Sequence, residues 1–284
     1  MIRPTLDRSI PIFHLSSSRP PKARATLLAT ALAGLVAAGA GCDSMSTCGT
    51  SLGAGGAGAG GAGGAGGQAA AAVVGCSDPD PGVVDYLDDM EDGNAMILGR
   101  DGRIGYWYTY HDPTAGTLNP DMGVDPVMEP IVGGRCGASA KAMRVTGSGF
   151  NDWGAGFAFS LKYMAGKEQP YDATRFSGIT FWARIGETST SQIQLGIGDQ
   201  WSRPDGGHCT IEAGPMTCYD NFGTLMTFTT TWQRYTVRFA QMQQRSFGLP
   251  RAALDTTALM TVEFGIPPGA PVFDIWIDDV AFFQ

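Results

Sequence analysis

The sequence predicts an all-β protein, a two-sheet antiparallel β-sandwich of the jelly-roll type. Two observations predict it. Between residues 85 and 284 the strong hydrophobic period of an amphipathic helix is absent, and short apolar or alternating runs recur between glycine, proline, asparagine and aspartate. Regularly spaced short strands of this kind are typical of a sandwich. The runs cover residues 142–146, 156–161, 179–184, 193–197, 225–229, 235–239, 261–266 and 273–283.

The N-terminal segment has the pattern of an export signal. Lys22 and Arg24 precede an apolar stretch, residues 25–40, which ends in small residues and is short for a transmembrane span. Residues 39–42, Gly-Ala-Gly-Cys, resemble a bacterial lipobox. This resemblance implies a lipoprotein signal peptide over 1–41, a lipid on Cys42, and a membrane anchor facing the periplasm or the cell surface. The alternative is an ordinary signal cleaved nearby, and both place the protein outside the cytoplasm.

The segment that follows is expected to be a flexible tether. Residues 53–67 contain only glycine and alanine, so they cannot bury enough side-chain surface to offset the entropy of ordering. We therefore expect a tether over 42–82. A single folded domain is expected over 83–284, because no second low-complexity break interrupts it.

The charge balance argues against polyanionic partners. Removing residues 1–41 deletes five basic residues and one acidic residue, which moves the formal net charge from −8 to −12. A protein of this charge, without a basic stripe, is not expected to bind nucleic acid or anionic lipid headgroups. We expect the folded domain to be a monomer.

Six cysteines in an exported chain are expected to form disulfides before they form metal sites. Cys209 and Cys218 lie nine residues apart around a segment containing glycine and proline, and are predicted to pair. If Cys42 carries the lipid, three cysteines are left. Two pairings stay open for them, Cys76–Cys136 and Cys48–Cys76.

Two acidic clusters bracket the predicted domain, at residues 88–93 and 273–280. The second lies inside an aromatic and β-branched run that must be a strand, where a carboxylate is costly unless it is paired or bound to a cation. A calcium ion held by oxygen ligands from both chain ends would explain the pattern. The alternative is that these acids only cap turns and remain solvated.

Four segments resemble the galactose-binding-domain-like jelly rolls, most of all the family 11 carbohydrate-binding modules. They are residues 87–93 with the aromatic 106–108, the strand 176–183, the tryptophan-led strand 232–239, and the closing strand 277–280. Residues 147–156 and 209–218 have no clear counterpart. The resemblance implies a structural Ca²⁺ near the joined chain ends and a sheet face that binds β-linked glucans. The expected calcium ligands are Glu91 and Asp278, with Asp89, Asp92 and Asp279 as alternates.

Sugar binding requires an aromatic platform and planar hydrogen-bonding groups, because a pyranose presents apolar C–H faces and hydroxyl groups. Alternation puts polar residues and Trp182 on the sheet surface opposite the core. The expected ligand-binding residues are Trp182, Arg184, Gln194, Arg238, Gln244, Trp107 and Tyr108. Further candidates are Tyr110, Trp153, Trp201 and Asp199.

The sequence favours a binding protein over an enzyme. His111 and Asp112 are adjacent, and adjacent residues on an extended chain point apart. No Gly-x-Ser-x-Gly elbow, zinc-binding His-Glu-x-x-His helix or phosphate loop stands out. The expected function is a non-catalytic, surface-anchored module for a β-glucan or related polysaccharide, with no catalytic residue. The alternatives are a jelly-roll glycoside hydrolase acting on β-glucan, or an adhesive or structural lipoprotein that binds a protein partner.

Overall fold

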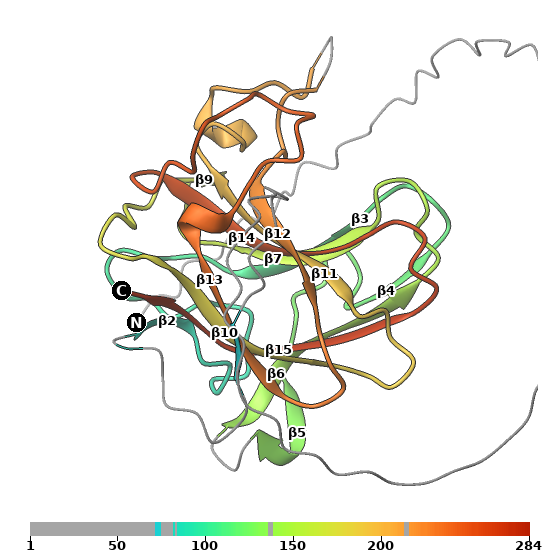
Figure 1. The fold of residues 1–284 in the computed structure, drawn as a ribbon. Helices are drawn as coiled ribbons and strands as arrows, with labels where there is room; N and C mark the ends of the chain where they lie inside the picture. Colours follow the sequence, from blue (N-terminus) through green and yellow to red (C-terminus); the bar gives the residue numbers. More distant parts are fainter. Residues whose placement is uncertain (1–71, 75–81, 83, 136–138, 213–215) are drawn as a thin grey trace, which may run out of the picture. The chain divides into compact units, whose positions relative to one another are not determined.

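In the part of the chain that the structure describes, two antiparallel β-sheets pack face to face, as Figure 1 shows. The structure is a computed structural model that describes residues 72–74, 82, 84–135, 139–212 and 216–284. Beyond its strands the described chain contains two short 3₁₀ turns, η1 (Pro204–Gly206) and η2 (Phe239–Gln241). The predicted all-β sandwich is therefore confirmed.

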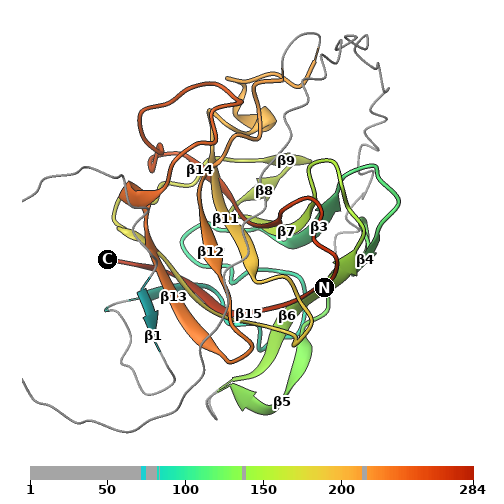
Figure 2. The same cartoon turned by 45° about the vertical axis from the view of Figure 1, so that its right-hand side comes forward.

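The larger sheet, sheet 1, has eight strands. Figure 2 shows the short strand β1 beside β13, at the edge of this sheet. β2 pairs with β15, and β5 pairs with β6. In spatial order the path runs β1 (Ala72–Val74), β13 (Gln233–Arg238), β10 (Gly178–Ile185), β15 (Phe273–Phe283), β6 (Ser139–Ser148) and β4 (Thr117–Asn119), with β2 (Val84–Asp88) and β5 (Glu129–Arg135) off this path.

The smaller sheet, sheet 2, has five strands. A separate two-stranded hairpin, β8 (Tyr163–Met164) and β9 (Lys167–Glu168), follows β7 in the chain. The spatial order of sheet 2 is β12 (Phe222–Thr227), β11 (Gln192–Asp199), β14 (Leu259–Ile266), β7 (Ala155–Ser160) and β3 (Trp107–His111).

The order of the strands is that of a jelly roll. Neighbours in sheet 1 run β6, β15, β10, β13, while neighbours in sheet 2 run β7, β14, β11, β12. The chain therefore crosses between the sheets at every step from β6 to β15 except the β8–β9 hairpin and the β11–β12 connection. This winding brings the two sheets face to face around one core.

The core lies between the sheets and is built by alternating residues. Ile193, Leu195 and Ile197 of β11 are fully buried, as the alternation predicted. Phe181 of sheet 1 meets Phe264 of sheet 2 edge to face, with ring centres 5.0 Å apart. Such aromatic contacts across the layers hold the two sheets together.

The two ends of the domain meet in sheet 1. β2 pairs antiparallel with β15, so that Asp88 lies opposite Val280 and the two acidic clusters are neighbours. Cys209 and Cys218 form the predicted disulfide. Cys42, Cys48, Cys76 and Cys136 lie outside the described residues, as do the signal peptide and most of the tether. Among the described residues, no helix is long and apolar enough to cross a membrane.

Candidate functional site

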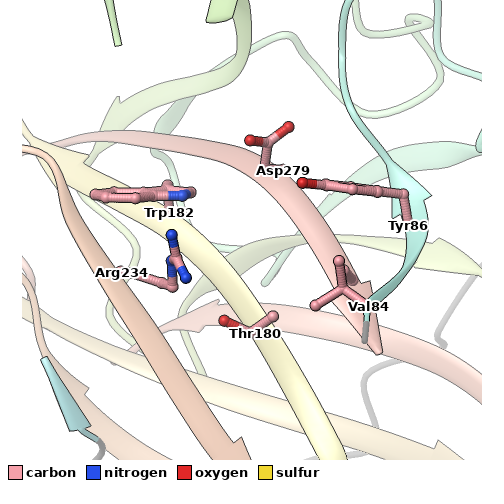
Figure 3. Close-up of a pocket in the computed structure, with 7 residues that line it drawn as sticks. Val84, Tyr86, Thr180, Trp182, Arg234 and Asp279 are labelled. Atoms are coloured by element: carbon pink, nitrogen blue, oxygen red, sulfur yellow. The ribbon is translucent and has the colours of Figure 1, made fainter. Parts of the chain in front are cut away.

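The outer face of sheet 1 carries Trp182, the residue expected to stack on sugar. Its side chain is only 5% exposed. The guanidinium carbons of Arg135 and Arg234 lie 4.6 Å and 4.9 Å from the centre of its ring. Figure 3 shows Trp182 and Arg234 lining a small hollow with Tyr86 and Asp279. That hollow has a volume of about 10 Å³, which is the space of one water molecule.

The same pattern continues along the outer face of sheet 1. Arg184 and Arg144 lie 4.3 Å and 4.7 Å from the ring centre of Trp276, which is 7% exposed. Arg184 also lies 5.3 Å from the ring of Trp232. Arginine and tryptophan thus cover one another across neighbouring strands. The prediction that Trp182 offers an open platform is therefore wrong, because its ring is already covered.

Two other predicted ligand residues, Trp107 and Gln244, also serve the fold. Trp107 is fully buried between the sheets, so its expected contact with a ligand is wrong. Its Nε1 donates to Asp88 Oδ2 over 2.8 Å. Gln244 uses its amide within a loop, where Nε2 donates to two carbonyl oxygens and Oε1 accepts from the backbone of Arg251. Arg238 is exposed on sheet 1, near the ring of Phe283.

The outer face of sheet 2 has a floor of very small residues. Cross-strand pairing sets Gly156 beside Gly265, and Gly196 beside both Gly223 and Glu263. A Cβ on Gly156 would lie 2.4 Å from the ring of Tyr110, and a Cβ on Gly196 would lie 2.5 Å from Glu263 Oε1. The glycines therefore allow larger side chains to lie flat over the strands.

A row of aromatic rings follows β3 along this floor. Tyr106, Tyr108 and Tyr110 alternate outward and are half-buried, with 6.4 Å between the ring centres of Tyr108 and Tyr110. Trp153, from the loop before β7, stacks on Tyr110 with ring centres 6.2 Å apart and planes inclined by 27°. Because Trp153 is 48% exposed, the row ends in an indole that a ligand can reach.

An ion pair lies at the other end of the tyrosine row. Arg203 Nε donates to Glu168 Oε2 over 2.8 Å, and its Nη2 donates to Tyr108 Oη over 3.3 Å. Ser160 Oγ donates to Glu168 Oε1 over 2.9 Å. These bonds fix the Arg203 guanidinium beside the aromatic row, where its charge is balanced by Glu168.

Glu263 is the half-buried carboxylate of the glycine floor. It forms no ion pair with any described residue. Burial raises its pKa above the ordinary value, while Arg203 and the amide of Asn221 oppose the rise. Burial also raises the pKa of Tyr108 to about 12, so that its hydroxyl stays protonated at neutral pH. The face thus offers neutral hydroxyls and one carboxylate to a ligand.

The predicted calcium ligands lie together beside Arg135. Its Nε donates to Asp278 Oδ2 over 2.6 Å, and its Nη2 pairs with Asp279. Glu91 Oε1 accepts from Ser139 Oγ over 2.8 Å and from the backbone N–H of Ala140 over 2.9 Å. Within the described ranges no group of three or more acidic, histidine or cysteine residues is arranged to hold a metal ion.

The acidic region leaves one acceptor open. Oδ1 of Asp278 is buried and accepts no hydrogen bond from a described residue. Asp89 and Asp92 instead accept from the backbone N–H groups of Glu91 and Asn94, as in the alternative that these acids cap turns. Arg135 pairs with both Asp278 and Asp279, and its single positive charge balances one of the two carboxylates. The calcium site therefore stays a prediction.

Four of the sequence candidates come together on the outer face of sheet 2: Tyr108, Tyr110, Trp153 and Gln194. Trp201 lies in a loop beside this sheet, where it stacks on His208, and Asp199 is buried.

Sequence reasoning missed Arg203 and Glu168 and did not select Glu263. The spacing of Gly196 and Gly198 in β11, which lie opposite Glu263 and Thr261 of β14, was a usable signal for the floor. Nothing local marked Arg203, because it reaches the face from a loop.

Comparisons with known proteins found solved structures of low sequence identity and low structural similarity. No family model and no curated protein matches the chain. The family 11 carbohydrate-binding module of a cellulosomal cellulase of Clostridium thermocellum is 12% identical, at a TM-score of 0.43, covering 72% of this chain and 96% of that one. A family 11 carbohydrate-binding module from Clostridium thermocellum in complex with a β-1,3-1,4-mixed-linked tetrasaccharide is 14% identical, at a TM-score of 0.42. The alignment covers 68% of this chain and 96% of that one.

A third solved structure is the family 30 carbohydrate-binding module of a cellulosomal cellulase of Clostridium thermocellum. It is 14% identical, at a TM-score of 0.35, and the alignment covers 63% of this chain and 97% of that one. These likenesses assign neither a family nor a ligand to this chain. A ligand for this chain can therefore be inferred only from the chain's own residues.

Proposed function

We propose that this chain is a non-catalytic carbohydrate-binding module whose ligand lies on the outer face of sheet 2. The observation that carries the proposal is the exposed indole of Trp153, stacked on Tyr110 at the end of a glycine floor. An exposed aromatic ring supplies the apolar surface on which the C–H face of a pyranose packs.

Polar groups beside the rings suit the hydroxyls of a sugar. The carboxylate of Glu263 accepts hydrogen bonds, while the amide of Gln194 can both donate and accept. Gln194 lies next to the floor, since a Cβ on Gly223 would lie 2.5 Å from its Nε2. Aromatic stacking together with acceptors and donors at the same face supports recognition of a polyhydroxylated ring.

The shape of the face favours a linear polysaccharide. The rings of Tyr108, Tyr110 and Trp153 follow one another at 6.4 Å and 6.2 Å, so the aromatic surface is extended rather than a single ring. Arg203 is balanced by Glu168, so the charge of this arginine is not free to attract an acidic sugar. We propose a neutral β-glucan or a related plant or microbial polysaccharide as the ligand.

The remaining part of the proposal concerns location. The lipobox-like Cys42 and the glycine–alanine tether support a domain that lies outside the cytoplasm and is anchored to a membrane through the tether. Replacing Cys42 with serine should move the protein from the membrane fraction to the soluble fraction. If the wild-type protein is already soluble, the lipid anchor is refuted.

Affinity gel electrophoresis tests the binding function. Soluble β-glucans, xylans and mannans are cast in native gels, each with calcium and with a chelator, and the chain is run against a non-binding protein. Retardation by a β-glucan without release of reducing sugar supports the module. Sugar release would support a glycoside hydrolase, and no retardation in any gel would support a protein partner.

A further inference from the structure

Three buried aspartates stand at the ends of sheet 2, and each gathers backbone N–H groups from a loop. Asp112 follows β3, Asp199 ends β11, and Asp220 precedes β12. Their side chains are at most 1% exposed. A buried carboxylate without a partner would be costly, so the bonds that each one accepts are part of the fold.

Asp112 binds the loop that carries Trp153. Its Oδ2 accepts from the backbone N–H groups of Asp152, Trp153 and Gly154, over 2.8 Å, 3.1 Å and 2.9 Å. Its Oδ1 accepts from the backbone N–H and the hydroxyl of Thr114. Hydrogen bonds from Thr114 and from the loop outweigh burial and hold the pKa of Asp112 below its ordinary value.

The other two aspartates hold loops at the opposite end of the sheet. Asp199 Oδ1 accepts from the backbone N–H groups of Trp201 and Ser202, and its Oδ2 accepts from Asp255. Asp220 accepts in the same manner from three backbone N–H groups of one loop, those of Arg245, Phe247 and Gly248. The same device therefore recurs around sheet 2.

The geometry points to Asp112 as a positioning residue that presents Trp153 to the ligand before binding. This inference rests on the proposed function. Three consecutive N–H groups of an irregular loop converge on one oxygen, so the backbone that carries the indole has its orientation fixed from the sheet. A platform fixed in advance loses less conformational freedom on binding. Asp199 and Asp220 fix their loops in the same way.

The replacement Asp112→Asn tests this directly. It keeps the size of the side chain but replaces one of the two acceptor oxygens with an N–H₂ group, which then faces a backbone N–H of Thr114 or of residues 152–154, whichever way the amide is turned. We expect amide hydrogen exchange at residues 152–154 to accelerate at least tenfold, with the strands of sheet 2 unchanged. Affinity for soluble β-glucan should fall at least tenfold. In a Trp153→Ala background the same change should cost less than twofold, because the positioned group is gone.

Asp172→Asn is the matched control. Asp172 is exposed and accepts from the backbone N–H and hydroxyl of Thr174, as Asp112 does from Thr114, but binds no second loop. It should leave exchange at 152–154 and affinity unchanged. If Asp112→Asn fails to fold, Thr114→Ala, which removes one hydroxyl bond to Asp112 and one to Asn151, serves as the milder variant.

The outcomes separate the two proposals. Equal loss of affinity in the two backgrounds, or unchanged exchange at 152–154, overturns the positioning role while the wild-type chain still binds glucan. A wild-type chain that binds no glycan refutes the proposed function, and the exchange measurement then still decides whether Asp112 fixes the loop.

Discussion

The indole of Trp153 stacks on the phenol of Tyr110, at 6.2 Å between the ring centres. The two residues come from different segments, one from the loop before β7 and the other from β3, and only Trp153 is largely exposed. Their contact extends the aromatic row of sheet 2 to its solvent-accessible end. Trp153 is therefore the ring of this pair that a ligand can reach more fully.

Replacing Trp153 with alanine should abolish most sugar binding and leave the fold intact. A stacked aromatic pair contributes roughly 0.5–1.5 kcal/mol beyond its buried area, so the Tm should change little, while glucan affinity should fall at least tenfold. Affinity electrophoresis and thermal melting measure the two effects. Trp232→Ala, the same change on the outer face of sheet 1, is the control and should bind as the wild type does.

The replacement Trp182→Ala should have the opposite effect, a loss of stability with glucan binding retained. The ring is 5% exposed and lies between Arg135 and Arg234. Its loss should lower the free energy of unfolding by about 3 kcal/mol, the usual scale for removing a buried tryptophan. Urea denaturation measures this loss. Unchanged stability together with lost glucan binding would return the ligand to sheet 1.

The arrangement of strands explains why the sequence misplaced the site. Alternation separates inward from outward residues, and it predicted the buried Ile193, Leu195 and Ile197 correctly. It does not say which sheet a strand joins. Trp182 and Gln194 were therefore put on one surface, although they lie on the outer faces of different sheets.

Long-range partners account for the other differences. Arg135, which covers Trp182, comes from a distant segment, β5, and no local pattern marks that contact. Tyr108, Tyr110 and Trp153 lie outside the core, which the sequence could indicate because alternation and loop position are local properties, and their contact with a ligand stays a prediction. The prediction that Trp107 contacts a ligand was wrong because the aromatic triplet 106–108 is compatible with either register of the strand. In the register that the strand adopts, Trp107 points into the core.

Glu263 makes stability depend on pH. Burial raises the pKa of its carboxyl above the ordinary value of the unfolded chain. The contribution of the protonated Glu263 to folding stability is therefore fully present below about pH 4, and it is lost as the pH rises through the pKa of the folded chain. Relative to the wild type, Glu263→Gln should be more stable at about pH 8 than at about pH 4. Denaturant titrations at both values measure the difference, and a pH-independent difference would refute this role of Glu263.

Calcium should raise the melting temperature if it binds beside Asp278. The open, buried Oδ1 of Asp278 is the acceptor that a cation would use, and Arg135 is its competitor for the two carboxylates. A chelator should lower the Tm of the wild-type chain. Melting curves with added calcium and with chelator that coincide would rule out a structural calcium at this position.

The most direct test of where the ligand lies is a nuclear magnetic resonance titration with a soluble β-glucan oligosaccharide. We predict chemical-shift changes in the indole N–H of Trp153 and in the backbone amides of β3, β7, β11 and β14. Changes confined to β10, β13 and β15, around Trp182, would contradict this prediction.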